Sequence, residues 1–543
     1  MTATESSPSL ALPDLPVVND VTRHLTFHRS FLPVWERNAD APGPTCGDRS
    51  HTWGEHRERV IRLVDALGSE LGLGRTSRYA VLALNSIEYL ELYHAAYLGG
   101  GIINPLNIRL AAKEIAFILD DSGTEVVFVD AIFAPLVEAI RDEVSSVRAV
   151  VLVGPEPEGE VRIDHRYDDL IEAGRPVVPP ETEETDPACL MYTGGTTGLP
   201  KGVIHTQRSH SLAIAVFDRA GYGVDRESTY LIAAPMFHAA TQPGVTAAPV
   251  SACRLLIIPM FSPAAFLDAV EHGGGSMTLI VPTMIRMVID DPSCSADRLR
   301  NMKILTYGGS PMPLGVLERV LELLPDGEVV QGYGMTEGLP LTLLPDADHR
   351  AGGERLRSAG KVVPSVDVSI QDPDGKILAT GDTGEICCRA GHYLHGYWNR
   401  PEETERALGS GWYRTGDVGY LDDDGYLFLV DRAKDMIISG GENVYTAEVE
   451  SAISTHPKIA DVAVIGIPSE EWGEAVHAVV VPVEGESVTE DEVIAHAREQ
   501  IANYKVPRSV DIRTEPLPVS GAGKTLKRAL RDPYWEGVER SVH

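Results

Sequence analysis

Basic residues are scarce in this 543-residue chain. Lysine and arginine together number 47 against 79 aspartates and glutamates, which gives a formal net charge of −32 at pH 7. A chain this acidic repels nucleic acid and anionic membrane surfaces, so the sequence predicts neither as a partner. An anionic ligand would have to be held locally, by backbone N–H groups, helix N-termini and a few placed cations. Each lysine or arginine in a glycine-rich context is therefore a candidate ligand-binding residue.

Long apolar runs and a basic leader are also missing. No stretch approaches the ~18 apolar residues needed to cross a bilayer. The first twenty residues contain neither lysine nor arginine, whereas a signal or transit peptide is positively charged. The sequence therefore predicts a soluble, cytoplasmic protein without stable membrane insertion, and it leaves open whether the chain forms a homodimer.

Cysteine is rare and shows no CxxC spacing. Most of the cysteines lie in apolar surroundings, which favours buried reduced thiols over a disulfide framework or a zinc site. The six are Cys46, Cys189, Cys253, Cys294, Cys387 and Cys388.

Short apolar runs alternate with helical patterns from residue 23 to about 430. The runs include 79–84, 126–129, 150–153, 230–233, 255–258, 279–281 and 304–306, and apolar spacing predicts a helix around residues 60–67. This alternation indicates an α/β fold with parallel-rich sheets covered by helices. The acidic, proline-rich stretch 155–187 is typical of a linker or of a surface excursion before the glycine-rich motif. After about 365, short strands with Asp-Gly turns predict a β-rich subdomain, and beyond 434 a small α+β unit follows.

The segment Tyr192–Gly202, YTGGTTGLPKG, is the strongest single motif. It follows an apolar run that predicts a strand, and it contains four glycines, four hydroxyl-bearing side chains and a lysine. Glycines let backbone N–H groups approach phosphate oxygens, hydroxyls donate hydrogen bonds, and the ammonium group offsets charge. An ordinary surface loop has a similar composition, so this motif alone leaves both interpretations open.

Three further motifs contain candidate ligand-binding residues, and the first of them follows the apolar pair Val329-Val330. QGYGMTEG, residues 331–338, contains Thr336, which could donate to a phosphate, and Glu337, which could hold Mg²⁺. YRTGD, residues 413–417, ends in Asp417, a carboxylate that could accept both hydroxyls of a ribose. DRAKDMIISGGEN, residues 431–443, combines charge with a double glycine. Each motif by itself could be an ordinary turn.

Near the C-terminus, PVSGAGKT places Lys524 on a glycine-rich loop. It fails as a P-loop, because Pro518 stands where the first glycine of that pattern would be. His238, which follows a predicted strand, could equally be a core histidine.

Together, and in this order, these motifs resemble those of the adenylate-forming (AMP-binding) superfamily, in its acyl-CoA synthetase and fatty-acid–CoA ligase branch. The resemblance covers about residues 50 to 530. It implies a flexible leader at 1–22, an AMP-binding domain at 23–432 with the β-rich subdomain at about 365–432, a hinge at 433–434 and a mobile C-terminal domain at 435–543. Thr446 stands where the family usually has a proline.

The resemblance also implies roles for individual residues. Lys524, Thr336, Glu337 and His238 would be catalytic, with Glu337 holding the metal. Lys434 would be the hinge, and Gly440 and Gly441 would line the CoA tunnel. Phe237, Gly308 and Met335 would line the acyl pocket. ATP or AMP would contact Thr193, Gly194, Gly195, Thr196, Thr197, Gly198, Lys201, Gly309, Ser310, Gly332, Tyr333, Gly334, Asp417 and Arg432.

The implied reaction joins a carboxylic acid to coenzyme A at the expense of ATP, with Mg²⁺, through an acyl-adenylate and with pyrophosphate release. No acidic residue follows His238 closely, which favours a hydrophobic acid with a fatty, aromatic or polycyclic tail. The alternatives are an acyl-AMP ligase that loads a carrier protein, a luciferase-like oxygenase and a non-catalytic acyl-nucleotide sensor.

Overall fold

The computed structural model describes residues 25–193, 200–310, 312–432, 435–439, 442–469, 472–519 and 525–536. The predicted leader at 1–22 and the predicted hinge at 433–434 lie outside these ranges, so the domain boundaries stay predictions. Within the described ranges, no helix is both long and apolar enough to cross a membrane.

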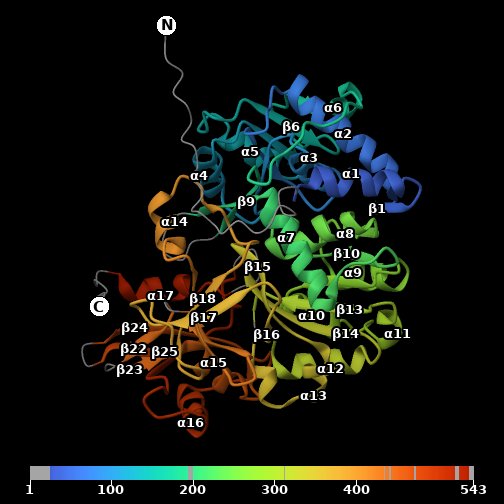
Figure 1. The fold of residues 1–543 in the computed structure, drawn as a ribbon. Coiled ribbons are helices and arrows are strands. Elements are labelled where there is room, and N and C mark those ends of the chain that lie inside the picture. Colours follow the sequence, from blue (N-terminus) through green and yellow to red (C-terminus); the bar gives the residue numbers. More distant parts are fainter. Residues whose placement is uncertain are drawn as a thin grey trace.

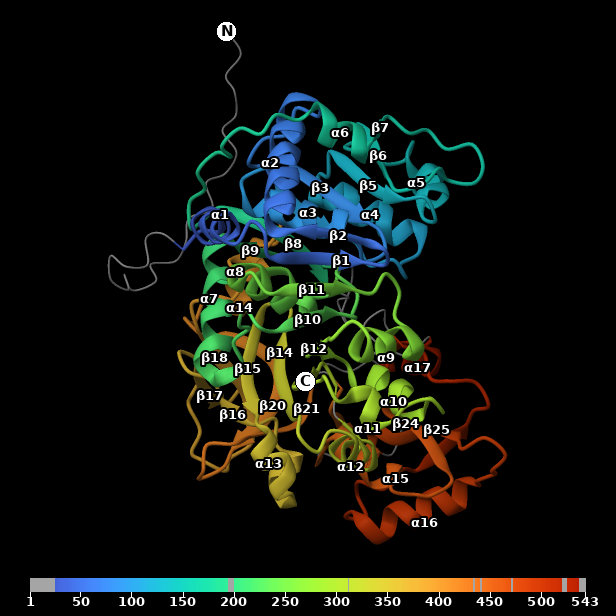
Figure 2. The same cartoon turned by 90° about the vertical axis from the view of Figure 1, so that its right-hand side faces the viewer.

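Two large, mostly parallel sheets form the first four hundred residues (Figures 1 and 2). Within the described ranges one sheet has eight strands, in the order β19 (Gly396–Tyr397), β9 (Lys201–Thr206), β8 (Pro187–Thr193), β4 (Ile102–Pro105), β3 (Arg78–Leu82), β5 (Val126–Asp130), β6 (Ala149–Val153) and β7 (His165–Arg166). The other, counted over the same residues, has nine: β16 (Lys361–Val362), β15 (Gly338–Leu344), β14 (Glu328–Met335), β13 (Ile304–Gly308), β12 (Met277–Ile280), β10 (Thr229–Ile232), β11 (Arg254–Ile257), β1 (Pro42–Cys46) and β2 (Arg49–Thr52).

Helix α3 (Ile87–Tyr97) lies between these sheets. All of its residues are buried, and one hydrophobic cluster joins it to Tyr79 of the first sheet and Tyr230 of the second. A helix buried on every side needs such a position, and its polar residues Glu88, Glu91 and His94 are buried with it. The helices that accompany it in this part of the chain are α1 (Phe27–Arg37), α2 (Trp53–Ser69), α4 (Ala112–Ser122), α5 (Ala134–Ile140), α6 (Tyr167–Ala173), α7 (Gln207–Phe217), α8 (Ala248–Ser251), α9 (Pro263–Glu271), α10 (Pro282–Asp290), α11 (Ala296–Leu299), α12 (Leu314–Leu323), α13 (Asp346–Ala351) and α14 (Pro401–Leu408).

Two smaller sheets follow. The β-rich part holds β17 (Asp367–Gln371), β18 (Gly384–Arg389), β20 (Tyr413–Leu421) and β21 (Leu427–Arg432). The C-terminal unit holds β22 (Ile437–Ser439), β23 (Glu442–Val444), β24 (Ile459–Ser469), β25 (Gly473–Pro482) and β26 (Ser509–Ile512), with α15 (Thr446–Ser454), α16 (Glu490–Gln500) and α17 (Lys527–Trp535). This unit lies at the end of the molecule opposite α2 and α6 (Figures 1 and 2).

The predicted fold class is confirmed, and the strands expected at the apolar runs are present. The helix expected around residues 60–67 is α2, and a capping box at Thr489 opens α16. The linker predicted at 155–187 is wrong in part. Helix α6 forms within it and packs on α2, because Tyr167 is 1 % exposed and anchors the segment to the core.

Candidate functional site

The glycine-rich motif connects two neighbouring antiparallel strands. Strand β8 ends at Thr193, which pairs with Lys201 at the start of β9, and the Thr193 hydroxyl donates to the Lys201 carbonyl oxygen at 3.5 Å. Thr193 and Lys201 thus mark the two ends of the loop. The predicted phosphate-binding residues between them, Gly194, Gly195, Thr196, Thr197 and Gly198, lie outside the described residues.

The base of this hairpin is fixed by Asp121, at the C-terminal end of α4. The Tyr192 hydroxyl donates to one carboxylate oxygen of Asp121 and the Arg400 guanidinium to the other, each at 2.7 Å. Trp398 donates its indole N–H to the Asp121 carbonyl oxygen at 3.1 Å. Sequence reasoning missed Asp121, because its partners lie 71 to 279 positions away.

The side chain of Lys201 is held loosely at the hairpin. Its Nζ lies 3.6 Å from Glu403 and 5.6 Å from the centre of the Tyr397 ring. The side chain is 25 % exposed, and an ion pair of this length in partial contact with water contributes little stability. A phosphate could therefore recruit the ammonium group at small cost.

Strands β13 and β14 approach each other most closely at two glycines. Gly308 pairs with Gly332, and a Cβ at Gly308 would collide with the Gly332 carbonyl oxygen. The next residue, Gly309, has φ +83°, in the left-handed region that glycine adopts without strain. Ser310 follows and is partly buried. These glycines let the chain end β13 with a sharp turn while the two strands stay paired.

Thr336 and Glu337 occupy a two-residue turn between β14 and β15. Met335 pairs with Gly338 across this turn, so Thr336 and Glu337 are the two residues that connect the paired strands. Both residues are partly buried. The turn therefore places two side chains at adjacent positions: the Thr336 hydroxyl, predicted to bind phosphate, and the Glu337 carboxylate, predicted to bind the metal.

Two hydrogen bonds hold the turn in place. The Tyr397 hydroxyl donates to Glu337 Oε1 at 2.9 Å, and the Leu394 N–H donates to the Glu337 carbonyl oxygen at 2.7 Å. The second of these bonds ties the turn to the segment before β19. Because β19 also pairs with β9, Tyr397 contacts both the Lys201 side chain and the Glu337 carboxylate. Tyr397 therefore links the glycine-rich hairpin to the turn that was predicted to hold the metal.

A further hydrogen bond links β14 to the predicted ribose residue. The Tyr333 hydroxyl donates to Asp417 Oδ2 at 2.6 Å, across 84 positions of sequence. Asp417 in β20 is the register partner of Arg432 in β21. Gly416 donates its N–H to Glu385 at 3.2 Å. Its φ of +74° changes the direction of the backbone just before Asp417. Strand β14, which also includes the predicted nucleotide residues Gly332 and Gly334, is thus joined to β20.

The residues around His238 are organised by a buried asparagine. Asn85 accepts from the Met236 N–H at 2.8 Å and donates to the Ala234 carbonyl oxygen at 2.9 Å. His238 then caps the short helix η3 (Ala239–Thr241), where its Nδ1 accepts from the Ala240 N–H at 3.2 Å. Phe237 is 9 % exposed. Asn85 is a second positioning residue that sequence motifs did not reveal.

Several predicted site residues cannot be placed. Lys434, Gly440, Gly441 and Lys524 lie outside the described residues, and of Arg432 only the backbone is described. The hinge, the CoA tunnel and the catalytic lysine therefore stay predictions, as does the acyl pocket.

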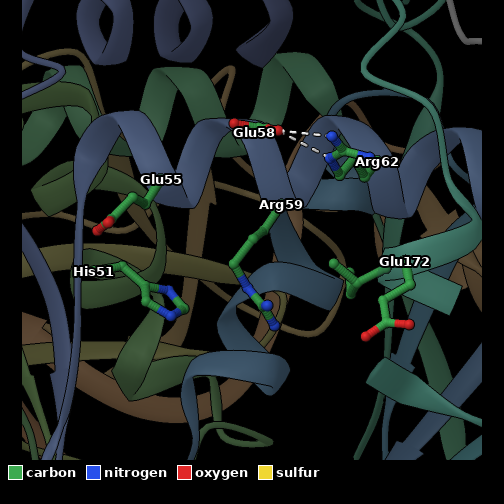
Figure 3. A pocket seen from close by; sticks show the side chains of 7 residues that line it. His51, Glu55, Glu58, Arg59, Arg62 and Glu172 are labelled. Atoms are coloured by element: carbon green, nitrogen blue, oxygen red, sulfur yellow. Dashed lines mark hydrogen bonds and ion pairs between the residues drawn. The ribbon is translucent and has the colours of Figure 1, made fainter. Parts of the chain in front are cut away.

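A surface pocket of about 500 Å³ lies elsewhere, on α2 and α6 (Figure 3). Its lining residues are His51, Glu55, Glu58, Arg59, Arg62, Ile171 and Glu172. None of the predicted nucleotide or acyl residues is among them.

The fold and the joined motifs define the class of protein. The family model "AMP-binding enzyme" matches residues 33–398, and "AMP-binding enzyme C-terminal domain" matches residues 448–524. The chain belongs to the AMP-binding enzyme family.

Individual relatives agree with this assignment. The chain is 37% identical over 493 residues to the long-chain-fatty-acid–CoA ligase FadD13 of Mycobacterium tuberculosis, with 89% of this chain and 93% of the relative covered. It is 32% identical over 534 residues to the fatty acid–[acyl-carrier-protein] ligase ScoC of Streptomyces coeruleorubidus, with 97% and 99% covered. The crystal structure of ATP-bound MatB from Rhodopseudomonas palustris superposes with a TM-score of 0.82 at 26% identity, covering 92% of this chain and 98% of that one.

Proposed function

We propose that this protein is an ATP-dependent acyl-CoA synthetase that activates a hydrophobic carboxylic acid and transfers the acyl group to coenzyme A. The observation that carries the proposal is that two tyrosines connect motifs that are distant in sequence. The Tyr397 ring lies near Lys201 and its hydroxyl donates to Glu337, while the Tyr333 hydroxyl donates to Asp417. These contacts support the proposal, because they link Lys201, at the end of the predicted phosphate loop, and the carboxylates that would hold the metal and the ribose to neighbouring strands.

In the first half-reaction a carboxylate oxygen attacks the α-phosphorus of ATP, and the bond to pyrophosphate breaks. Charge gathers on the phosphate oxygens, so donors and cations must be in place beforehand. Lys201 and the N–H groups of its loop would hold the β- and γ-phosphates, and Thr336 would donate to the α-phosphate. Lys524 would lie between the carboxylate and the α-phosphate.

The Glu337 carboxylate fits Mg²⁺, because it is a hard oxygen ligand placed in a tight turn and oriented by Tyr397. Bound Mg²⁺ would neutralise charge on the phosphates. Asp417 would orient the ribose, and Tyr333 keeps that carboxylate in place.

In the second half-reaction the CoA thiol attacks the acyl carbon and AMP leaves. The C-terminal unit would turn about Lys434 between the two steps, and Gly441 would leave room for the pantetheine chain. FadD13, whose name gives a long-chain fatty acid as its substrate, supports a hydrophobic acid here. The residues after His238, from Ala239 to Gln242, include no acid that could bind an ammonium group.

A panel of fatty, aromatic and polycyclic acids, each with ATP, Mg²⁺ and CoA, tests the proposal through pyrophosphate release and acyl-CoA formation. We expect both products with at least one hydrophobic acid. Accumulation of acyl-AMP without a thioester in the presence of CoA would contradict CoA as the acceptor.

The second candidate function is a ligase that loads a carrier protein. It is favoured by the likeness to ScoC, whose name gives an acyl-carrier protein as the acceptor. Adding a phosphopantetheinylated carrier protein to the same reaction separates the two acceptors, because only the carrier-loading enzyme would transfer acyl groups to it in preference to CoA.

A further inference from the structure

Two buried histidines form a hydrogen-bonded chain that fixes which ring nitrogens carry protons. His94 Nε2 lies 2.9 Å from the Val245 carbonyl oxygen, which can only accept, so this nitrogen donates. Both rings are 0 % exposed, and because burial disfavours a charged imidazole, each ring carries one proton. His94 Nδ1 therefore accepts the proton of His56 Nε2 at 2.7 Å. The free lone pair of His56 is left on Nδ1.

That lone pair faces other electron-rich atoms. His56 Nδ1 lies 4.0 Å from Glu91 Oε1, and His51 Nδ1 lies 3.7 Å from the same oxygen. His56 and Glu91 are both 0 % exposed, and neither Nδ1 atom has a hydrogen-bond partner among the described residues. A buried acceptor left unpaired is destabilising, because it has lost its hydrogen bonds to water. A cation between these three atoms would remove that cost.

We propose that His51, His56 and Glu91 bind one divalent transition-metal ion, with Zn²⁺ the best suited. Two imidazole nitrogens and one carboxylate oxygen form a ligand set that zinc uses, with bonds of about 2.0–2.2 Å. The three ligand atoms lie within 4.8 Å of one another. Ideal tetrahedral bonds of that length would separate them by roughly 3.4 Å, so the two measured Glu–His distances need to close by a few tenths of an ångström.

Neighbouring groups already orient two of the three ligands, Glu91 and His56. Arg59 donates to both oxygens of Glu91, at 2.6 and 3.1 Å, and the Tyr167 hydroxyl donates to Oε2 at 2.6 Å. These bonds leave a lone pair on Oε1, because a carboxylate has about four acceptor positions. His94 orients His56 in the same way by occupying its other nitrogen. Such outer hydrogen bonds usually accompany metal ligands.

The site also has a route to solvent. His51 and Arg59 line the pocket of about 500 Å³, and Figure 3 shows both side chains there. Glu55, Glu58 and Glu172 line the same pocket, and Glu58 pairs there with Arg62. A water molecule from the pocket would complete four-coordination. The metal would connect β2, α2 and α3 through His51, His56 and Glu91, so its role is structural and separate from ATP binding.

Metal titration of the full-length protein tests this proposal. Protein stripped with a chelator is titrated, without nucleotide, with Zn²⁺ and with Co²⁺. We expect one equivalent to bind per chain, the visible absorption of tetrahedral Co²⁺, and a higher Tm in the presence of Zn²⁺. Absence of stoichiometric binding would overturn the proposal.

Variants locate the ion. His51 is partly exposed, so His51→Ala and His51→Gln should keep the fold while weakening binding at least about 100-fold, beyond the loss typical of outer groups. Glu91→Gln should also abolish the Co²⁺ absorption. The matched control is His272→Ala, which changes an exposed cluster of Asp268, Glu271 and His272 that could also hold an ion. Binding retained in folded His51→Ala, or lost in His272→Ala, would assign the ion elsewhere.

Discussion

At the scale of single residues, two tyrosine hydroxyls hold the carboxylates that the proposed chemistry needs. A phenol that donates to a carboxylate fixes its orientation without neutralising it, so the carboxylate keeps its charge for a metal or a ribose. Tyr333 does this for Asp417 and Tyr397 for Glu337. Neither role can be inferred from a tyrosine in a motif, because the partner comes from a different part of the chain.

Tyr397→Phe should raise the Mg²⁺ concentration needed for adenylation. The variant loses one hydrogen bond to a charged group, which is worth about 1.5–3 kcal/mol, so we expect the rate at low Mg²⁺ to fall roughly 10- to 100-fold and to recover in part at high Mg²⁺. Pyrophosphate release over a Mg²⁺ series measures this. Tyr420→Phe, at a ring stacked on Phe428, is the control. An unchanged Mg²⁺ dependence would show that Tyr397 does not position Glu337.

Lys524→Ala should impair adenylation far more than thioester formation from supplied acyl-AMP. Losing one prearranged donor to the developing charge costs on the order of 10²–10³ in rate. Single-turnover assays of each half-reaction measure the two effects separately. Equal losses in both would contradict the assignment of Lys524 to the first step.

At the scale of elements, the close pairing of β13 and β14 determines where the turn after β13 begins. Gly308 faces Gly332 across this pair, and the space for a side chain is taken by backbone, which cannot move aside as a flexible side chain could. Gly308 is therefore needed for this strand pairing, besides any contact with an acyl group.

Gly308→Ala should destabilise the protein by about 1–3 kcal/mol, the usual cost of overpacking. Urea unfolding measures the difference. Gly315→Ala is a matched control in α12, where a Cβ meets nothing within 4 Å and alanine favours the helix by up to about 1 kcal/mol. If both variants had the same free energy of unfolding, the contact between Gly308 and the Gly332 backbone would not contribute to stability.

At the scale of the whole molecule, the proposed reaction needs two arrangements of the C-terminal unit. Gly441→Leu should leave adenylation intact and stop CoA attack, since its side chain would fill the predicted tunnel. Pyrophosphate release without acyl-CoA formation is the expected result. Normal thioester formation by this variant would exclude a tunnel at Gly441.

Much of the architecture could be predicted because it depends on local patterns. Apolar runs predicted the parallel strands, and the spacing of Val60, Leu63 and Leu67 predicted α2. The segment 155–187 was mistaken for a linker, since one large buried side chain, Tyr167, stabilises its helix through a contact that is remote in sequence. The histidines at 51 and 56 show no spacing typical of a zinc motif and have no cysteine partner.

The sequence by itself determined the family and the residue types of the site, because phosphate, ribose and metal each need particular chemical groups in short segments. Only the tertiary structure decided which side chains hold those groups in place, such as Asp121, Asn85 and Tyr397, and which buried atoms lack a partner. The physical reason is that hydrogen bonds and burial depend on distances between segments far apart in the chain, which local sequence does not specify.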